Sequence, residues 1–127
     1  MNYFVDMLPA SRCFIVWDKH LKNRLSFSEA EIAYASFNRM SKIVSVPAHQ
    51  PDRIHRCQKP VQLYEWLLHN YATEGDRILD THLGSGSIAL ACHNMGYSLD
   101  AYEIDAEYFA AASARLHEHQ RQYRLFI

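Results

Sequence analysis

The stretch RILDTHLGSGSIALACHNMGYSLDAYEID, residues 77–105, decides the fold. It starts with a short apolar run that ends at Asp80 and enters a turn containing Gly84 and Gly86. A helical repeat follows, and a second apolar run then ends in acidic residues. A strand that turns at once into a helix leaves backbone N–H groups pointing at the gap between them. The stretch therefore predicts a strand–helix–strand unit with a ligand site at the glycine turn.

Helical periodicity appears before and after the glycine turn. Pro60 suits the first turn of a helix, and the apolar face that follows it comprises Val61, Tyr64, Leu67, Leu68 and Tyr71. We expect this helix to end at Gly75. The second apolar face comprises Ile88, Ala91, Cys92 and Met95, and Gly96 is its expected C-terminal stop.

Two strands and a last helix complete this half of the chain. The apolar runs at 77–80 and 98–104 predict strands. Asp105 can cap the last helix, whose expected apolar side comprises Phe109, Ala112, Leu116 and Tyr123. Residues 60–123 thus predict an α/β unit with a parallel sheet.

The N-terminal part has a different pattern. CFIVW at 13–17 predicts a buried strand, and KIVSV at 42–46 predicts another. Residues 31–38 alternate loosely and indicate the returning strand of a hairpin, although their alanines also allow a helix. Residues 47–58 contain two prolines and no period, which is typical of a loop.

Length and composition limit the class of protein. The 127 residues, 49% of them hydrophobic, suffice for one domain. No apolar stretch approaches the roughly 18 residues that span a bilayer, and the N-terminus lacks the pattern of a signal peptide. The three cysteines form no Cys-x-x-Cys pair and indicate free thiols in a reducing cytoplasm. The eight histidines lack the spacing of a metal site. We therefore expect a cytoplasmic protein with no metal and no membrane contact.

Charge is distributed unevenly along the chain. Residues 1–60 hold nine Lys or Arg against five Asp or Glu, whereas residues 61–127 hold four against nine. A basic part beside an acidic part fits a protein that touches a polyanion with one part only, but such asymmetry also arises by chance.

The glycine turn has a matching acid on the next strand. Gly84-x-Gly86-x-x-Ala89 fits the loose dinucleotide fingerprint, and Glu103 lies nineteen positions after Gly84. A carboxylate at that position can accept hydrogen bonds from both hydroxyls of a ribose. The alternative is a tight turn with a solvent-facing acid. The fingerprint alone leaves open whether the nucleotide is nicotinamide, flavin or S-adenosylmethionine.

Three segments resemble a known family. HRCQKPVQLYEWLL, followed by GDRILDTHLGSGSIALA, resembles motifs X and I of the amino-group DNA methyltransferases. DAYEID is similar to their motif II, and CFIVWDK and FSEAEIAYASFN are similar to the segment after the catalytic strand in the permuted β-type order. Phage-type adenine-N6 enzymes are the nearest match. The resemblance implies a Rossmann-like methyltransferase fold that uses S-adenosylmethionine and acts on double-stranded DNA, as in restriction–modification.

The resemblance also assigns roles to residues. Gln58, Lys59 and Pro60 would lie at the methionine end of the cofactor, with Lys59 as the partner of its carboxylate. Asp80 would lie near the methionine amino group. The loop under the cofactor would comprise Gly84, Ser85 and Gly86. Glu103 would bind the ribose hydroxyls, whereas Asp105 is better explained as a helix cap.

Contacts with DNA are expected from the N-terminal part. Trp17 could border a flipped base, although a tryptophan at a strand end is more often part of the core. The cations Lys19, Lys22 and Arg24 could meet phosphate or could form a solvated hairpin tip.

One family motif is missing from this sequence. The catalytic Asp-Pro-Pro-Tyr does not occur, since there is no Pro-Pro pair, and the β-type order places it upstream of Met1. No catalytic residue is therefore expected in this chain. The family sheet has more strands than we can place, so we expect an incomplete sheet that pairs through a homodimer, strand exchange or a partner chain.

These observations predict a single partial methyltransferase domain over residues 1–127. It would comprise a strand and hairpin region at 1–46, a loop at 47–58 and a cofactor-binding half at 59–127. A non-catalytic module that binds cofactor or DNA and completes or regulates another chain is the alternative function. A nicotinamide oxidoreductase is disfavoured, because it needs further strands after Glu103.

Overall fold

The computed structural model describes residues 5–21, 28–49, 51 and 53–125. The chain forms two compact units, Met1–Ala48 and His49–Ile127. The division falls within the loop expected at 47–58, while a single partial domain over the whole chain stays a prediction.

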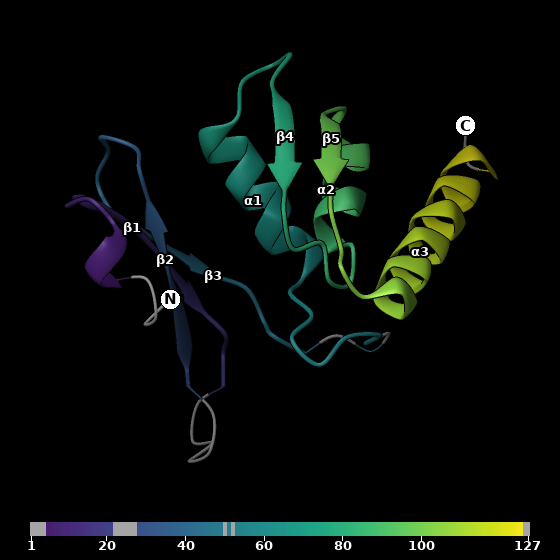
Figure 1. The fold of residues 1–127 in the computed structure, drawn as a ribbon, viewed down its shortest axis with the longest axis horizontal. Helices are drawn as coiled ribbons and strands as arrows, with labels where there is room; N and C mark the ends of the chain where they lie inside the picture. The colour runs from purple at the N-terminus through teal and green to yellow at the C-terminus, as the bar shows by residue number, and fades with distance from the viewer. Residues whose placement is uncertain (1–4, 22–27, 50, 52, 126–127) are drawn as a thin grey trace. The chain divides into compact units, whose positions relative to one another are not determined.

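The first unit contains a short 3-10 helix, η1 (Val5–Met7), and a three-stranded sheet (Figure 1). β1 (Cys13–Asp18) is the central strand; β2 (Ala30–Ala35) pairs with it antiparallel and β3 (Lys42–Ser45) pairs with it parallel. The hairpin interpretation is therefore confirmed, and the helical alternative for residues 31–38 is wrong. Pairing with β1 along six residues outweighs the low strand preference of alanine.

One face of this sheet is buried. Side chains alternate along β1, so that Cys13, Ile15 and Trp17 are buried together with Ala35 and Val44. The indole N–H of Trp17 donates a hydrogen bond to the backbone oxygen of Val46 at 2.7 Å. Trp17 thus links the end of β1 to the segment that follows β3.

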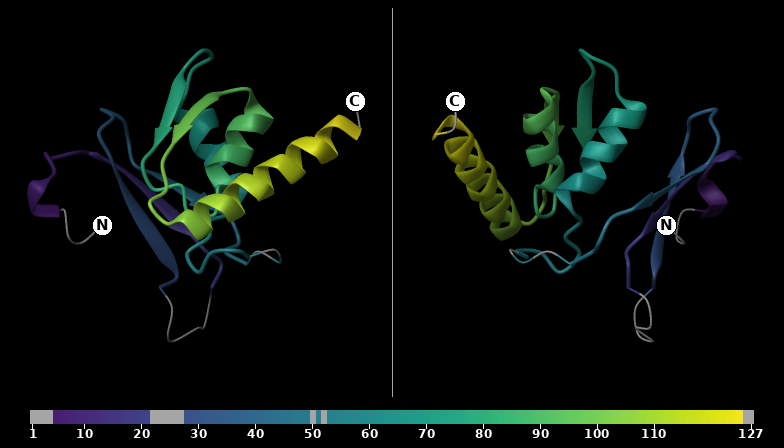
Figure 2. Two further views of the ribbon diagram at one scale, coloured as in Figure 1. Left: turned by 45° about the vertical axis from the view of Figure 1, so that its right-hand side comes forward. Right: turned by 180° about the vertical axis from the view of Figure 1, so that it is seen from behind.

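The second unit alternates helices and strands. Its elements are α1 (Val61–Tyr71), β4 (Arg77–Asp80), α2 (Ser87–Met95), β5 (Ser98–Ala101) and α3 (Ala106–Leu125). β4 and β5 are parallel neighbours, as expected for an α/β unit. Figure 1 and the reverse view in Figure 2 show α1 and α2 on the same side of the two strands.

The core of the second unit lies between this helix pair and the strands. Leu68 of α1 packs with Ile88, Ala91 and Cys92 of α2, and partly buried neighbours on the strands are Ile78 and Leu99. The helical faces expected from the sequence thus meet one face of the sheet. Gly96 ends α2 in the left-handed conformation, as expected for a C-terminal stop.

Two boundaries and the burial of one side chain differ from the expected ones. α1 ends at Tyr71 rather than at Gly75, because the carboxylate of Asp76 accepts hydrogen bonds from the backbone N–H and hydroxyl of Thr73 and forms a separate turn. β5 ends at Ala101 rather than at residue 104. Phe109 is 49% exposed, since α3 approaches α2 through Ala112, which is 2% exposed.

The described residues contain no helix that is both long enough and apolar enough to cross a membrane. Cys13, Cys57 and Cys92 are free thiols, of which only Cys57 is exposed. Burial, together with the negative charge of Asp80, raises the pKa of Cys92 to about 11, so this thiol stays protonated and unreactive.

A polar network joins α1, α2 and α3. The Nε2–H of His119 donates to Oδ1 of Asn94 at 2.6 Å, and the Asn94 amide donates to Glu65 at 2.7 Å. The His93 and His119 rings meet edge to face, with centroids 5.6 Å apart. Burial of the ring is the main cause that lowers the pKa of His119, and the nearby His93 and Arg115 lower it further.

This lowered pKa predicts a loss of stability in mild acid. The folded protein prefers the neutral His119 ring. The contribution of His119 to stability is therefore full above the ordinary pKa of 6.5 and is lost as the pH falls through the lowered pKa. Urea denaturation at neutral and mildly acidic pH should show a smaller acid-induced loss in His119→Gln than in the wild type. His117→Gln, at an exposed position of the same helix, should behave like the wild type. An equal loss in all three proteins would contradict the prediction.

Candidate functional site

The candidate site lies at the carboxyl ends of β4 and β5. The backbone N–H of Tyr102 donates to the oxygen of Asp80 at 2.9 Å, and the N–H of Leu83 donates to the oxygen of Tyr102 at 2.9 Å. These bonds extend the parallel pairing beyond the strands. They hold the glycine turn beside the segment that leads into α3.

Glu103 is bound to the glycine turn. Its Oε2 accepts a hydrogen bond from the N–H of Gly84 at 2.8 Å, and its Oε1 accepts one from the N–H of Asp105 at 3.0 Å. The backbone N–H groups of Asp105, Gly84 and Ile104 lower the pKa of Glu103, so its carboxylate is ionised at neutral pH. The structure therefore brings together the acid and the turn that the sequence paired.

Asp105 has the capping role that we preferred for it. Its Oδ1 accepts hydrogen bonds from the N–H groups of Glu107 at 2.9 Å and Tyr108 at 3.0 Å, at the start of α3. The helix thereby begins directly after Glu103, and the cap limits the conformations open to that acid.

The two glycines of the turn serve different purposes. Both have positive φ, 56° at Gly84 and 75° at Gly86. A Cβ at Gly84 would make only an ordinary van der Waals contact, with the backbone oxygen of His82 at 3.9 Å. A Cβ at Gly86 would lie 3.0 Å from the Cβ of Ala112. Gly84 therefore leaves room at the turn, whereas Gly86 allows α3 to pack closely.

Arg115 holds the glycine turn through hydrogen bonds, and the sequence analysis did not identify this residue. Its guanidinium donates to the backbone oxygen of Ser85 at 3.1 Å and to Oγ of Ser87 at 2.9 Å. The hydroxyls of Ser85 and Ser87 are 3.1 Å apart, and both residues are buried. No local pattern links Arg115 to residues so far away in the sequence. The contact arises only when α3 packs on α2.

Asp80 begins the turn. Its Oδ1 accepts a hydrogen bond from the N–H of His82 at 2.9 Å, and its side chain is partly buried. The other carboxylate oxygen accepts no hydrogen bond from the residues that the structure describes. Asp80 thus combines a structural role with a charge at the end of β4.

Gln58 is a buried amide with an unused donor. Its Oε1 accepts a hydrogen bond from the N–H of Ile54 at 3.0 Å, whereas its Nε2 has no partner among the described residues. The residue is only 3% exposed, and a buried donor left unpaired costs about 1–3 kcal/mol. An oxygen of a bound molecule would relieve that cost. Pro60 is fully buried and Lys59 is partly buried.

A ring contact links the Gln58 turn to the start of α3. The His55 ring lies 4.3 Å from the Tyr108 ring, centroid to centroid, and the backbone oxygen of His55 accepts a hydrogen bond from the N–H of Gln58. Tyr108 follows the helix cap at Asp105. The Gln58 turn and the Glu103 segment are therefore anchored to the same end of α3.

Ile104 is a second residue that sequence reasoning missed. It lies between Glu103 and Asp105 and is fully exposed, at 102%. The sequence assigned it to the strand, yet its exposure places an apolar side chain beside the acid. No group of His, Cys, Asp or Glu in the described ranges has an arrangement suited to a metal ion.

The expected DNA contacts belong to the first unit. Trp17 is 5% exposed and already hydrogen-bonded, which gives it a structural role. Nζ of Lys19 lies 3.2 Å from Glu31 and 5.8 Å from the Trp17 ring centroid, and its side chain is only 12% exposed. Lys22 and Arg24 lie outside the described residues. These contacts stay predictions.

Comparison with protein families gives an extensive match. Residues 11–114 match the N6/N4 family model described as DNA methylase. Among curated proteins, the type II methyltransferase M.HpaI of Haemophilus parainfluenzae is 37% identical over 62 residues. That alignment covers 49% of the present chain but only 20% of M.HpaI.

Solved structures share the fold. The crystal structure of the M1.HpyAVI–SAM complex matches with a TM-score of 0.60 and 24% identity, covering 81% of this chain and 60% of that one. TTHA0409, a putative DNA modification methylase from Thermus thermophilus complexed with S-adenosyl-L-methionine, matches with a TM-score of 0.56 and 18% identity, covering 84% and 52%. The expected Rossmann-like methyltransferase fold is thus confirmed, and the chain spans little more than half of either structure.

Proposed function

Because the chain belongs to the N6/N4 DNA methylase family, we propose that it forms the S-adenosylmethionine-binding part of a cytoplasmic, phage-type DNA methyltransferase acting on adenine N6. The observation that supports this most directly is the contact between Glu103 and Gly84 at the carboxyl ends of β4 and β5. Nucleotide ligands bind at this edge of open α/β sheets. Double-stranded DNA is the proposed substrate.

The residues at this edge fit the chemistry of the cofactor. Glu103 offers an ionised carboxylate for ribose hydroxyls, and Ile104 offers apolar surface for the adenine ring. Because Gly84 has no side chain and is uncrowded, the cofactor can come close to the backbone there. We assign Ser85 and Gly86 to the same loop, with Arg115 and Ala112 holding that loop in place.

The methionine end of the cofactor carries an amino group and a carboxylate. Asp80 would attract the amino group, and Lys59 would pair with the carboxylate. The unpaired Nε2 of Gln58 would donate to an oxygen at this end, and buried Pro60 fixes the turn that presents Gln58 and Lys59. The donor and acceptor groups of these residues are therefore complementary to a zwitterion.

When bound, S-adenosylmethionine supplies a methyl group activated by its sulfonium. The chain's own residues bind and orient the cofactor, and such positioning provides much of the rate of a transfer between two bound molecules. The sequence contains no Asp-Pro-Pro-Tyr to hold the target amino group. We propose that another polypeptide segment supplies that motif.

Calorimetric titration of the purified chain with S-adenosylmethionine tests the proposal. Micromolar binding would support a cofactor site in this chain, and the closely related S-adenosylhomocysteine should compete. NAD is the control ligand, because it shares the adenosine but lacks the methionine. Tighter binding of NAD, or no binding of either compound by a folded chain, would contradict the proposal.

The alternative is a non-catalytic module that binds cofactor or DNA and completes or regulates another chain. The absence of Asp-Pro-Pro-Tyr from the sequence favours it. A methyl-transfer assay on unmethylated DNA separates the two functions. The chain is assayed alone and together with a partner segment that contributes only the missing motif. Adenine methylation under either condition would favour the enzyme. Cofactor binding without transfer under all such conditions would favour the module.

We also propose that a second polypeptide, either another copy or a partner chain, covers the outer face of the β4–β5 sheet. α1 and α2 pack on the other face, and Leu79 is 64% exposed on the outer one. Arg77 pairs there with Asp100, and Tyr102, 64% exposed, follows on the same side. Exposed apolar side chains beside unpaired strand edges are typical of a surface that associates.

Leu79→Lys should therefore reduce association. The new charge would have to be desolvated in any contact that covers this face, so we expect self-association, measured by sedimentation at increasing concentration, to weaken about tenfold or more. Met40→Lys changes a 72% exposed side chain in the first unit and serves as the matched control. A wild-type chain that stays monomeric at every concentration would exclude the second copy and leave only a partner chain.

A further inference from the structure

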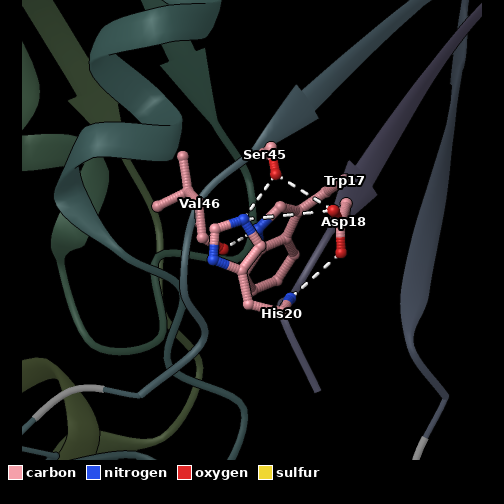
Figure 3. Close-up of polar contacts among 5 residues, drawn as sticks. All are labelled: Trp17, Asp18, His20, Ser45 and Val46. Atoms are coloured by element: carbon pink, nitrogen blue, oxygen red, sulfur yellow. Dashed lines mark hydrogen bonds and ion pairs between the residues drawn. The ribbon is translucent and has the colours of Figure 1, made fainter. Parts of the chain in front are cut away.

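A polar cluster lies at the carboxyl ends of β1 and β3 in the first unit (Figure 3). Asp18 ends β1, Ser45 ends β3, and the two residues are partners in the parallel ladder. The Ser45 hydroxyl donates to Oδ2 of Asp18 at 3.0 Å and contacts Nε2 of His20 at 2.5 Å. Neither the fold of the second unit nor the proposed cofactor site uses these three side chains.

The hydrogen bonds determine which nitrogen of His20 bears a proton. Ser45 has one hydroxyl hydrogen, and Asp18 accepts it. In the contact between Ser45 and His20, Nε2–H must therefore be the donor. This order of carboxylate, hydroxyl and imidazole differs from that of a hydrolase triad, in which the serine is terminal. Ser45 is thus no nucleophile, and Nδ1 of His20 has no hydrogen-bond partner among the residues that the structure describes.

The backbone holds His20 in an uncommon conformation. Its φ is 56°, in the left-handed region that residues other than glycine seldom adopt. The N–H of His20 donates to Oδ1 of Asp18 at 3.0 Å, so one carboxylate holds both the backbone and, through Ser45, the ring. The His20 side chain is 47% exposed. The ring is therefore fixed in orientation and still open to a ligand.

We propose that protonated His20 binds a phosphate of the DNA backbone through Nδ1–H, with Asp18 and Ser45 as positioning residues. This proposal rests on the proposed function. Lys19, the neighbouring cation, is paired with Glu31 and largely buried, whereas the His20 ring is accessible. The N-terminal part of the chain also has the surplus of positive charge that DNA attracts.

The contact depends on the protonation of His20. Because Nε2 keeps its proton, a neutral ring presents Nδ1 as an acceptor, which repels a phosphate oxygen; a protonated ring presents it as a donor. Imidazole changes charge between about pH 5 and 8. The Asp18 carboxylate lies 3.9 Å from Nε2. Ionisable groups in the described parts of the adjoining segments include Lys19, Glu29 and Glu31.

The salt dependence of DNA binding tests this inference. Each phosphate contact adds about 0.9 to the slope of log affinity against log salt concentration. The slope for duplex DNA, measured by fluorescence anisotropy, should fall by about one unit between about pH 5.5 and pH 8 in the wild type. His20→Gln should show the low slope at both pH values and bind about fivefold more weakly in acid. His117→Gln, on α3, is the matched control and should behave like the wild type.

A second readout does not depend on DNA. Nitrogen-detected NMR of the free chain should show the Nε2–H form of neutral His20, and Ser45→Ala should weaken that preference. DNA binding by the wild type with the same pH-dependent slope in His20→Gln would overturn the His20 contact and leave the proposed function standing. Failure of the folded wild type to bind DNA at low salt would overturn the His20 contact, whereas calorimetry with S-adenosylmethionine tests the proposed function separately.

Discussion

Replacing Glu103 by alanine is expected to weaken S-adenosylmethionine binding by about 100-fold, the loss expected for two hydrogen bonds to a charged group. The variant would also release the N–H groups of Gly84 and Asp105, which the carboxylate now holds. Ordering the released turn would then cost free energy when the cofactor binds. Calorimetry on wild type and variant measures the effect.

Two further variants separate charge from position. Glu107→Ala removes an exposed acid from the first turn of α3 and should bind the cofactor like the wild type. Glu103→Gln keeps one acceptor oxygen and should fall between wild type and Glu103→Ala. Affinity of Glu103→Ala within about threefold of the wild type would mean that Glu103 does not bind the ribose.

The pKa of Glu103 adds a pH signature. Backbone N–H groups lower it below the ordinary value of 4.5, so the carboxylate that we propose to bind the ribose is ionised throughout the neutral range. The contribution of Glu103 to cofactor binding is full above pH 4.5 and is lost only as the pH falls through the lowered pKa of its carboxyl. Cofactor affinity should therefore not decline between neutral pH and about pH 5 on account of Glu103.

The second large effect is expected at Gly86. Gly86→Ala should lower the free energy of unfolding by about 3 kcal/mol, because the alanine must adopt positive φ and its Cβ must displace α3. The Cβ would lie 3.0 Å from that of Ala112, closer than ordinary van der Waals contact. Urea denaturation followed by circular dichroism measures the loss.

Gly96→Ala is the matched control for Gly86→Ala. Gly96 has nearly the same φ, 76° against 75°, but a Cβ there would meet nothing within 4 Å. Its substitution should cost only the conformational strain, about 1 kcal/mol. Adding Ala112→Gly to Gly86→Ala should recover part of the loss. Equal losses in Gly86→Ala and Gly96→Ala would show that packing of α3 on the turn contributes nothing.

The sequence by itself determined the features that depend on neighbouring residues. The helical periodicity of the sequence predicted α1 and α2. Gly96 predicted the end of α2, and Asp105 predicted the N-terminal cap of α3. The pairing of the glycine turn with Glu103 also followed from the order strand, turn, helix, strand. These features arise within one turn or one crossover unit, where chain geometry leaves few alternatives.

Tertiary structure decided the features that join distant residues. For residues 31–38 the sequence left both a strand and a helix open, and pairing of β2 with β1 decided for the strand. Arg115 reached Ser85, and Ala112 reached Gly86, only because α3 packed across α2. Asp18, His20 and Ser45 met because β1 and β3 end side by side. No local pattern encodes such contacts, since each depends on how two separately formed elements pack.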